Sequence, residues 1–376
     1  MKRILIHLCL LLILGLIGYS LATTPITTAS SQWSITTLDD IDPGSYIHHS
    51  DTSLAVDDED TIHVSYRGPN YDLRYATNKN GGWSTEVVYD IAANVARENS
   101  IAVDSNDHPH LSFSFSDGGN EDLKYAKNIT GTWVITTIDS LGSVGMENDL
   151  TVDSNNNIHI SHFQWNGARL RYSSNESGIW ATTEVITDAG WDRTSIAADS
   201  NNHTHIVYRD FSTTRIYYAT NLSGIWVITD TEVGGSSPAI ALDSNDKVHL
   251  SYSSGSELKY ATNVSGSWVT VTITSGVTAG RHHSIAVGPQ SKVHLSFYDS
   301  VEGDLQYANN VTGSWVIYPV DSQGDVGRSN SIAIDSLGFI HISYRDDTNA
   351  KLKYATIGPG PVSGVTFTYL PIVLKQ

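Results

Sequence analysis

Cysteine is almost absent from this 376-residue sequence. The only one, Cys9, lies in an apolar run over residues 4–17. Lys2 and Arg3 precede this run and Ser-Leu-Ala follows it at residues 20–22, a pattern typical of a secretory signal peptide. We expect residues 1–22 to be removed, the alternative being an uncleaved anchor, for which the run is short. A mature chain without cysteine excludes disulfides, thiolate metal sites and a cysteine nucleophile.

Basic residues are also scarce. The chain has 22 Lys and Arg against 40 Asp and Glu, which gives a formal net charge of -18. Such a charge repels nucleic acid and anionic lipid surfaces, so we expect no nucleic-acid partner and no membrane contact beyond the signal peptide. A bound anion would need a local cluster of arginines.

Four short segments recur about every 46 residues along the chain. The first is apolar and ends in Asp in six of seven copies, the third resembles LRYATN, and the fourth opens with Trp. The second begins with His in all seven copies, at His63, His110, His159, His205, His249, His294 and His341. Four short strands separated by turns are the pattern of one propeller blade. The sequence therefore predicts an all-β fold, a seven-bladed β-propeller of four-stranded antiparallel blades over residues 23–357.

The Trp segment occurs only six times after the repeats begin. The seventh repeat stops at residues 351–356, whereas Trp33 and the residues after it precede the first repeat and have the composition of a fourth strand. We expect this N-terminal strand to complete the last blade, because that removes two exposed sheet edges. Residues 358–376 form a Gly/Pro linker and an apolar tail, which we expect to pack as an extra strand or to serve as a cell-surface sorting segment.

The two ends of such blades carry different turns. The turns from the first to the second strand and from the third to the fourth lie at one end, here called the bottom. The turns from the second to the third strand and the connections between blades lie at the other end, the top.

The seven histidines lie at the bottom, each on a different blade, which is too far apart to share a metal ion. We expect no metal and no cofactor. Asp, His and Trp of each blade are instead predicted to form a hydrogen-bonded network similar to that of WD-repeat blades. Blade 6 has Gly288 in place of the Asp and should lack it.

The turns before the Trp strands read NITGTW, NLSGIW, NVSGSW and NVTGSW. They resemble the Asp-box of sialidase-like propellers, S-x-D-x-G-x-x-W, with the Asp absent and Gly two residues before Trp. The repeat is also similar in unit length to that of seven-bladed propeller lectins. These resemblances imply a propeller and leave two activities to weigh, glycan hydrolysis and glycan binding.

Function is expected at the top, because the repeats differ there. We expect Arg97, Arg281 and Arg328 to point toward the axis, with Arg193 beside them. Other candidate ligand-binding residues on this face are Arg67, Arg209, Arg345, His282, His283, Trp191 and Tyr298. Planar guanidinium groups suit carboxylate or sulfate, so an acidic sugar is a natural ligand.

Two other interpretations stay open at the top. The arginines could pair with nearby acids such as Asp72, Glu98 and Asp347, and so neutralise the rim. Aromatic residues on the same loops, including Tyr71, Trp165 and Phe211, could stack on sugar rings or pack between blades.

The sequence thus favours a secreted or cell-surface binding module for a carbohydrate with acidic groups, acting as a monomer on a glycan or a cell-surface protein. The alternatives are a sialidase-like glycosidase or polysaccharide lyase, and a protein-binding structural propeller. A sialidase would need an Arg cluster and a Tyr nucleophile, for which Tyr298 is one candidate. No spacing singles out a catalytic residue.

Overall fold

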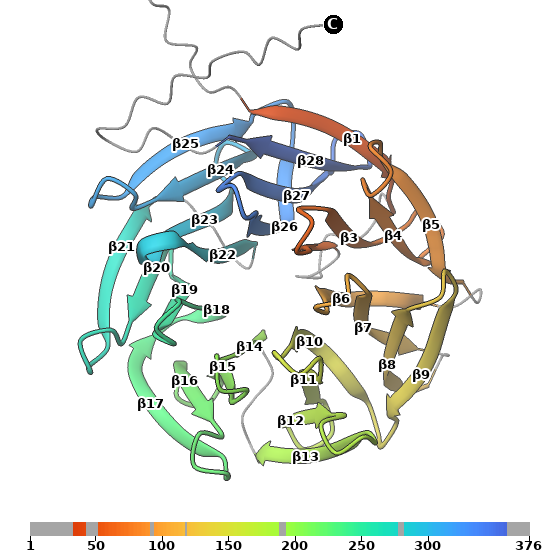
Figure 1. Ribbon diagram of the computed structural model, residues 1–376. Coiled ribbons are helices and arrows are strands. Elements are labelled where there is room, and N and C mark those ends of the chain that lie inside the picture. Colours follow the sequence, from red (N-terminus) through yellow and green to blue (C-terminus); the bar gives the residue numbers. More distant parts are fainter. Residues whose placement is uncertain are drawn as a thin grey trace, which may run out of the picture. The chain divides into compact units, whose positions relative to one another are not determined.

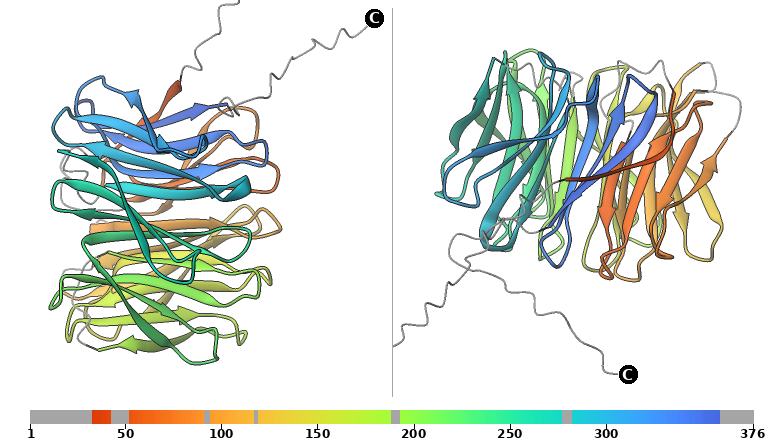
Figure 2. Two further views of the ribbon diagram at one scale, coloured as in Figure 1. Left: turned by 90° about the vertical axis from the view of Figure 1, so that its left-hand side faces the viewer. Right: turned by 90° about the horizontal axis from the view of Figure 1, so that it is seen from above.

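The computed structural model describes residues 33–42, 52–90, 94–116, 119–187, 193–276 and 282–358, and for residues 94–97 the backbone alone. Seven four-stranded antiparallel sheets stand in a ring around a central axis (Figure 1). The predicted seven-bladed propeller is confirmed. The turns gather at the two ends of the blades (Figure 2).

Each blade runs from an innermost first strand to an outermost fourth strand. Blade 1 contains β2 (Thr52–Val56), β3 (Ile62–Arg67), β4 (Leu73–Thr77) and β5 (Ser84–Tyr89), and blade 2 contains β6 (Asn94–Val103), β7 (Pro109–Ser116), β8 (Glu121–Asn128) and β9 (Trp133–Asp139). Blade 3 contains β10 (Val144–Val152), β11 (Ile158–Gln164), β12 (Arg169–Ser174) and β13 (Ala181–Ile186), and blade 4 contains β14 (Thr194–Ala198), β15 (Thr204–Asp210), β16 (Arg215–Thr220) and β17 (Val227–Gly234). Blade 5 contains β18 (Ser236–Leu242), β19 (Val248–Ser254), β20 (Glu257–Thr262) and β21 (Val269–Ser275), and blade 6 contains β22 (His283–Gly288), the short 3-10 helix η1 (Pro289–Ser291), β23 (Lys292–Asp299), β24 (Asp304–Asn309) and β25 (Val316–Asp321). Blade 7 contains β26 (Val326–Ile334), β27 (Ile340–Asp346), β28 (Lys351–Ile357) and β1 (Ser34–Asp40).

The hydrophobic core lies between neighbouring blades. The second strand of each blade is covered on both faces, and all six residues of β3 are buried. Leu73 and Tyr75 of blade 1 pack with Leu111 and Phe113 of blade 2, and an equivalent cluster occupies each of the other six junctions. Because apolar burial is the main stabilising contribution, each blade depends on its neighbours.

The N-terminal strand closes the ring, as predicted. Strand β1 pairs antiparallel with β28, and Ser34 lies opposite Thr356 (Figure 1). Lys351 and Asp40 form an ion pair at the other end of this strand pair. The Trp33 ring packs edge-on against Tyr307 of blade 6, with ring centroids 5.3 Å apart. The seventh Trp is therefore supplied by the N-terminal strand.

A hydrogen-bonded unit repeats at the bottom of the blades. In blade 1, His63 Nε2 lies 3.0 Å from Asp57 Oδ2 and Nδ1 lies 2.6 Å from the Tyr75 hydroxyl. The carboxylate only accepts, so Nε2 carries the proton and Nδ1 accepts the Tyr hydroxyl proton. The same Asp-His contact occurs at 3.0–3.5 Å in six blades. The His-Tyr bond occurs in all seven.

The predicted role of Trp in this unit was wrong in one respect. The Trp at the start of each fourth strand covers the Tyr of the preceding blade, not the Asp-His pair of its own. Trp133 of blade 2, for example, packs edge-on against Tyr75 of blade 1 at 5.3 Å. The aromatic contact therefore joins blades, as do those of the other six fourth-strand tryptophans.

Blade 6 lacks the Asp of this unit, as predicted. A Cβ atom placed on Gly288 would lie 3.5 Å from His294 Nε2 and 3.2 Å from Ile334 Cδ1 of blade 7. Burial lowers the pKa of His294 to about 4. His294 keeps only its bond to Tyr307 among the residues that the structure describes.

The bottom turns link successive blades. The serine after the strand-ending Asp bonds a side chain in the turn of the next blade, as Ser105 does with Asn156 and Ser154 with Asn202. Ser200 and Ser336 make the same bond with an Asp of the next blade. In blade 1, Asp58 replaces this serine. On blade 2, Asp107 occupies the turn position whose side chain bonds the serine in the other pairs of blades. One carboxylate oxygen of Asp107 is buried without a hydrogen-bond partner.

Within the described residues, no helix has the length and apolar character needed to cross a bilayer. In the same part of the chain, no three His, Cys, Asp or Glu side chains are grouped so that they could hold a metal ion.

Candidate functional site

A bulge at the start of blade 7 positions Arg328 at the top. The pairing of β26 with β27 shifts register on both sides of Arg328. Gly327 has a φ of +108°, and a Cβ atom there would lie 2.8 Å from the Leu305 Cα of blade 6, so only glycine fits. The Asn330 amide closes the bulge by donating to the Gly327 carbonyl at 2.8 Å and to the His282 carbonyl at 2.9 Å.

Arg328 packs between blades 6 and 7. Its Cζ lies 4.8 Å from the centroid of the Tyr298 ring, and its Nη2 donates to the Tyr298 hydroxyl at 2.9 Å. It also lies 3.2 Å from a carboxylate oxygen of Asp325 and 3.3 Å from one of Asp347. The expectation that Arg328 points toward the axis was therefore wrong, because the bulge turns it onto the neighbouring blade.

Arg345 belongs to the same cluster. It is buried, its Nε donates to Asp347 Oδ1 at 3.0 Å and its Nη2 donates to the Asp42 carbonyl at 2.9 Å. Burial raises the pKa of Asp347 although two guanidinium groups face it. Two arginines and two aspartates thus meet here, so this part of the rim is largely neutralised, as one of the two interpretations of the arginines predicts.

Tyr298 is held in its neutral form. It is 4% exposed, and its hydroxyl donates to Asp325 Oδ1 at 2.7 Å. Burial, with that hydrogen bond to Asp325, raises the pKa of Tyr298 to about 12. A nucleophilic or basic tyrosine needs the opposite shift, so this environment does not favour nucleophilic chemistry at the hydroxyl.

His282 and His283 lie between blades. His282 Nδ1 accepts the Ser329 backbone N–H at 3.1 Å, and its ring meets Tyr298 edge-on. His283 is fully buried and bonds Ser251 of blade 5 at 2.9 Å. Burial, and next the charge of Arg193, lowers the pKa of His283 to about 3, so it is neutral at pH 7. Both rings hold neighbouring blades together.

Three exposed aromatic side chains lie on the top turns of blades 1, 3 and 4. Tyr71 is 43% exposed, Trp165 is 44% exposed and Phe211 is 53% exposed. The Cζ of Arg67 lies 4.6 Å from the Tyr71 ring centroid, and the Cζ of Arg209 lies 4.9 Å from that of Phe211. These two arginines hold aromatic rings at the surface through cation–π contacts.

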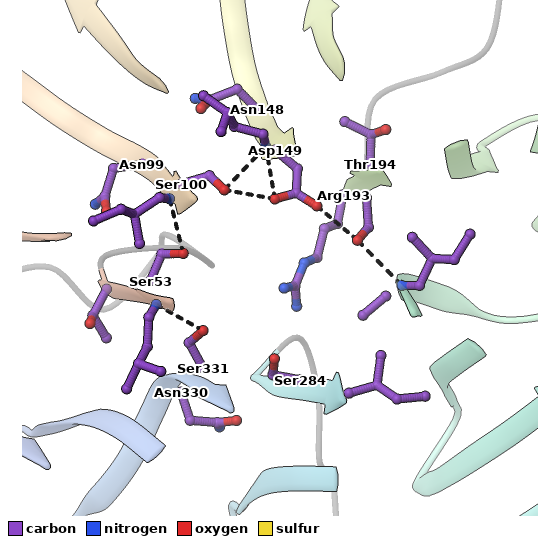
Figure 3. A pocket seen from close by; sticks show the side chains of 18 residues that line it. Ser53, Asn99, Ser100, Asn148, Asp149, Arg193, Thr194, Ser284, Asn330 and Ser331 are labelled. Carbon is purple, nitrogen blue, oxygen red and sulfur yellow. Dashed lines mark hydrogen bonds between the residues drawn. The ribbon is translucent and has the colours of Figure 1, made fainter. Parts of the chain in front are cut away.

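A cavity of about 160 Å³ occupies the channel between the first strands. It is lined by residues from all seven blades, among them Thr52, Asn99, Asn148, Arg193 and Asn330. Figure 3 shows Arg193 reaching from the start of β14 into the middle of this space. Its Nη1 donates to the His283 carbonyl of blade 6 at 2.9 Å. Arg193 is the candidate arginine that lies in the described lining of the channel.

A ring of small polar residues holds the blades together around this cavity. One position in each first strand contributes to it: Ser53, Ser100, Asp149, Ser195, Ala239, Ser284 and Ser331. Six of them accept a backbone N–H from the next blade at 3.0–3.3 Å, and Ala239 has no oxygen with which to do so. Asp149 also accepts the hydroxyl protons of Ser100 and Ser195 (Figure 3).

Several candidates lie outside the described residues. These are Arg281, Trp191 and the side chain of Arg97. The signal peptide, the linker beyond Gly358 and the apolar tail also lie outside them.

Sequence reasoning missed three features of the site. The Tyr of the LRYATN segments, present in all seven repeats, was visible in the sequence but was not assigned to the His network. The spacing of Gly and Asn in VGMEN and VGRSN, at residues 144–148 and 326–330, marks the bulges. Asp149 stands where five other repeats have Ser, and this difference makes the hydrogen bonding unequal on the two sides of the channel.

No protein-family model matches the sequence, and no curated protein matches it either. Several solved structures share the fold. A lectin of Aleuria aurantia, in complex with Fucα1-6GlcNAc, has 15% identity and a TM-score of 0.54 over 74% of this chain and 97% of its own. That lectin is described as a six-bladed propeller.

Two enzymes also share the fold. A fungal alcohol oxidase of the AA5 family, in complex with copper, has 11% identity and a TM-score of 0.59 over 90% of this chain and 79% of its own. The polysaccharide lyase Uly1 has 10% identity and a TM-score of 0.51 over 83% of this chain and 90% of its own. At such identities the likeness shows the fold alone, and this fold carries unrelated activities. The resemblance to sialidase-like propellers stays a prediction.

Proposed function

We propose that this protein is an extracellular carbohydrate-binding propeller, and that its top face contacts the glycan. The observation that carries the proposal is the set of exposed aromatic side chains on the top turns, Tyr71, Trp165 and Phe211. Export is part of the proposal and rests on the signal-peptide pattern of residues 1–22.

The exposed aromatics have a physical reason to bind sugar rings. The face of an aromatic ring carries partial negative charge, which attracts the C–H groups on the apolar face of a sugar. Tyr71 and Phe211 are supported by Arg67 and Arg209, so little side-chain freedom remains to be lost on binding. Leaving three large aromatic groups about half exposed to water on the top turns costs hydrophobic free energy. A ligand that covers these groups recovers that free energy, which is why exposed apolar groups mark binding sites.

Acidic glycans are the proposed class of ligand. Arg209 is half-buried at the top of blade 4, and Arg67 is buried at the top of blade 1. Guanidinium groups beside the aromatic rings favour carboxylate or sulfate groups on the sugar, in a protein whose net charge otherwise repels anions. Arg328 and Arg345 pair with Asp325 and Asp347 on the same face.

Binding to a glycan array tests the proposal. The mature protein should retain glycans, and acidic ones more strongly than neutral ones. Tyr71→Ala, Trp165→Ala or Phe211→Ala should each weaken retention by about tenfold, the size typical of losing one stacking contact. Tyr318→Ala is the matched control, because Tyr318 is 45% exposed but lies on the outermost strand β25 of blade 6.

Three outcomes would contradict the proposal. The first is that no glycan is retained, and the second is that Tyr318→Ala weakens binding as much as the top-face variants do. The third is turnover of a fluorogenic sialoside or uronide by purified protein, which would favour the glycosidase or lyase alternative. Capture of a single cell-surface protein without any glycan retention would favour the protein-binding alternative.

A further inference from the structure

The channel cavity has the size of a small ion or of one chemical group. Its volume is about 160 Å³. It lies below the range of about 300–1,000 Å³ typical of pockets that enclose a whole organic ligand. A small ion, or a single group that projects from a larger molecule, fits a space of this size.

The hydroxyl groups around the cavity are used differently on its two sides. On the side of blades 2 to 4, Ser100 donates to Asp149 Oδ1 at 2.8 Å and Ser195 donates to Asp149 Oδ2 at 2.9 Å. Each Asp149 oxygen also accepts one backbone N–H, so the carboxylate receives four hydrogen bonds from the wall. The protons of these two hydroxyls are therefore directed into the wall.

On the side of blades 6, 7 and 1 the hydroxyl protons have no such acceptor. Ser284, Ser331 and Ser53 each accept a backbone N–H from the next blade. No described residue accepts their hydroxyl protons, and all three are partly accessible from the cavity that they line. Three consecutive blades thus present an arc of hydrogen-bond donors to the channel.

Arg193 brings positive charge to this arc. Its side chain starts on blade 4 and crosses the channel, where Nη1 donates to the carbonyl of His283, the residue before Ser284. Arg193 and Asp149 are the charged side chains in the described lining. The Asp149 oxygens are bonded by the wall of the cavity, and the Arg193 guanidinium lies within the space that the seven blades enclose (Figure 3).

We propose that the channel is an oxyanion site. Arg193 and the hydroxyls of Ser53, Ser284 and Ser331 hold one carboxylate or sulfate-like group. The charged, planar guanidinium supplies the attraction and the arc of hydroxyls supplies further donors to the remaining oxygens. The occupant is a free inorganic anion or the acidic group of a sugar, and both share this chemistry. The site does not depend on the exposed aromatics, so its test is separate from that of glycan retention.

Calorimetric titration of the mature protein at constant ionic strength tests the site. The ligands are sulfate, glucuronate and, as an uncharged sugar, glucose. Sulfate and glucuronate should bind with one site per chain and raise the melting temperature, whereas glucose should not. Binding of sulfate alone identifies an inorganic anion site, and tighter binding of glucuronate identifies a sugar-borne carboxylate. Absence of binding by both anions overturns the proposal.

Variants assign the binding to the channel. Arg193→Gln should weaken anion binding by at least about tenfold, because it removes the charge but keeps a donor. Arg215→Gln is the control, since Arg215 lies exposed on β16 and pairs with Asp230, and it should bind as the wild type does. Equal weakening in both variants would mean that anion binding depends on the net charge of the protein and not on Arg193, and would overturn the assignment.

Two further variants keep the proposal testable if Arg193→Gln folds poorly. Ser331→Ala should weaken binding about threefold through loss of one donor, and blade 5 already carries Ala239 at this position. Asp149→Ser installs the residue found here in five other blades and removes a like charge, so binding should tighten by about tenfold. Weaker binding in Asp149→Ser, or unchanged binding in Ser331→Ala, would contradict the site.

Discussion

Replacing His283 by Asn should make the protein less sensitive to acid. Burial lowers the pKa of His283 to about 3 in the folded protein, from an ordinary value of 6.5. Between these values the unfolded chain binds a proton that the folded chain does not. The stability due to neutral His283 is therefore complete above pH 6.5 and is lost as the pH falls. At pH 5 the loss is about 2 kcal/mol, from about 1.4 kcal/mol per pH unit over about 1.5 units.

Other buried histidines also have a lowered pKa and act in the same direction, and two of them have large shifts. Burial lowers the pKa of His162 to about 3 and that of His294 to about 4. Together with His283 they should reduce the free energy of unfolding by about 6 kcal/mol between pH 7 and pH 5. That is a large part of the roughly 5–15 kcal/mol that stabilises a typical domain. The pKa of Asp104 is lowered to about 2, so its protonation affects stability only below the ordinary value of 3.8.

Asn is the informative replacement for His283. Blades 2, 3 and 7 carry Asn99, Asn148 and Asn330 at this position, and each accepts a serine hydroxyl from the preceding blade as His283 bonds Ser251. The variant should therefore keep the contact between blades and lose only the titrating group.

Urea-induced unfolding between pH 7.5 and pH 5, followed by the fluorescence of the nine tryptophans, measures the effect. The difference in the free energy of unfolding between pH 7 and pH 5 should be about 2 kcal/mol smaller in His283→Asn than in the wild type. His108→Asn is the control, because His108 lies in a partly exposed bottom turn where blade 3 has Asn157. Identical pH profiles for His283→Asn and the wild type would refute the reasoning.

Three other predictions follow from the blade junctions. Deleting residues 33–40 should expose the edge of β28 and the Tyr307 ring, so size-exclusion chromatography should show association or aggregation; a stable monomer would contradict the role of β1. Gly288→Asp should give His294 the missing carboxylate and raise its pKa, which NMR titration of the ring would detect; an unchanged pKa would show that Ile334 keeps the new side chain away. Asp58→Ser should restore the serine that bonds the next blade at this position in other repeats, give Asp107 a hydroxyl donor and stabilise the protein by about 1 kcal/mol in urea unfolding, and a lower midpoint would contradict this pairing.

The repeat alone predicts most of the fold. Seven copies of one four-strand pattern, with a Trp strand missing at one end and present at the other, predicted the blade number and the closure by Trp33. The Asp-His contact and its absence at Gly288 were also predicted. These features depend on which residues recur in each copy, and recurrence is visible in a single sequence.

Contacts between blades were harder to predict. A repeat shows what each blade contains but not which neighbour a side chain meets, so Trp133 was assigned to its own blade and not to Tyr75. Arg328 was expected at the axis because its place in the repeat was counted along a regular strand. The bulge at Gly327 adds residues and turns Arg328 toward Tyr298, which a regular period of two does not describe.

The closure of the ring by β1 also bears on how the chain can be cut. Ser34 and Thr356 lie opposite one another in one sheet, although they are 322 positions apart in the sequence. The seven junctions between blades repeat the same contacts, so the fold does not require the chain ends to lie at one particular junction. Circular permutants that join residue 358 to residue 33 through a short linker and open the chain between two other blades should fold to the same ring. In the natural order, the first strand must wait for the last blade to be synthesised, so completion of the ring belongs to the end of folding.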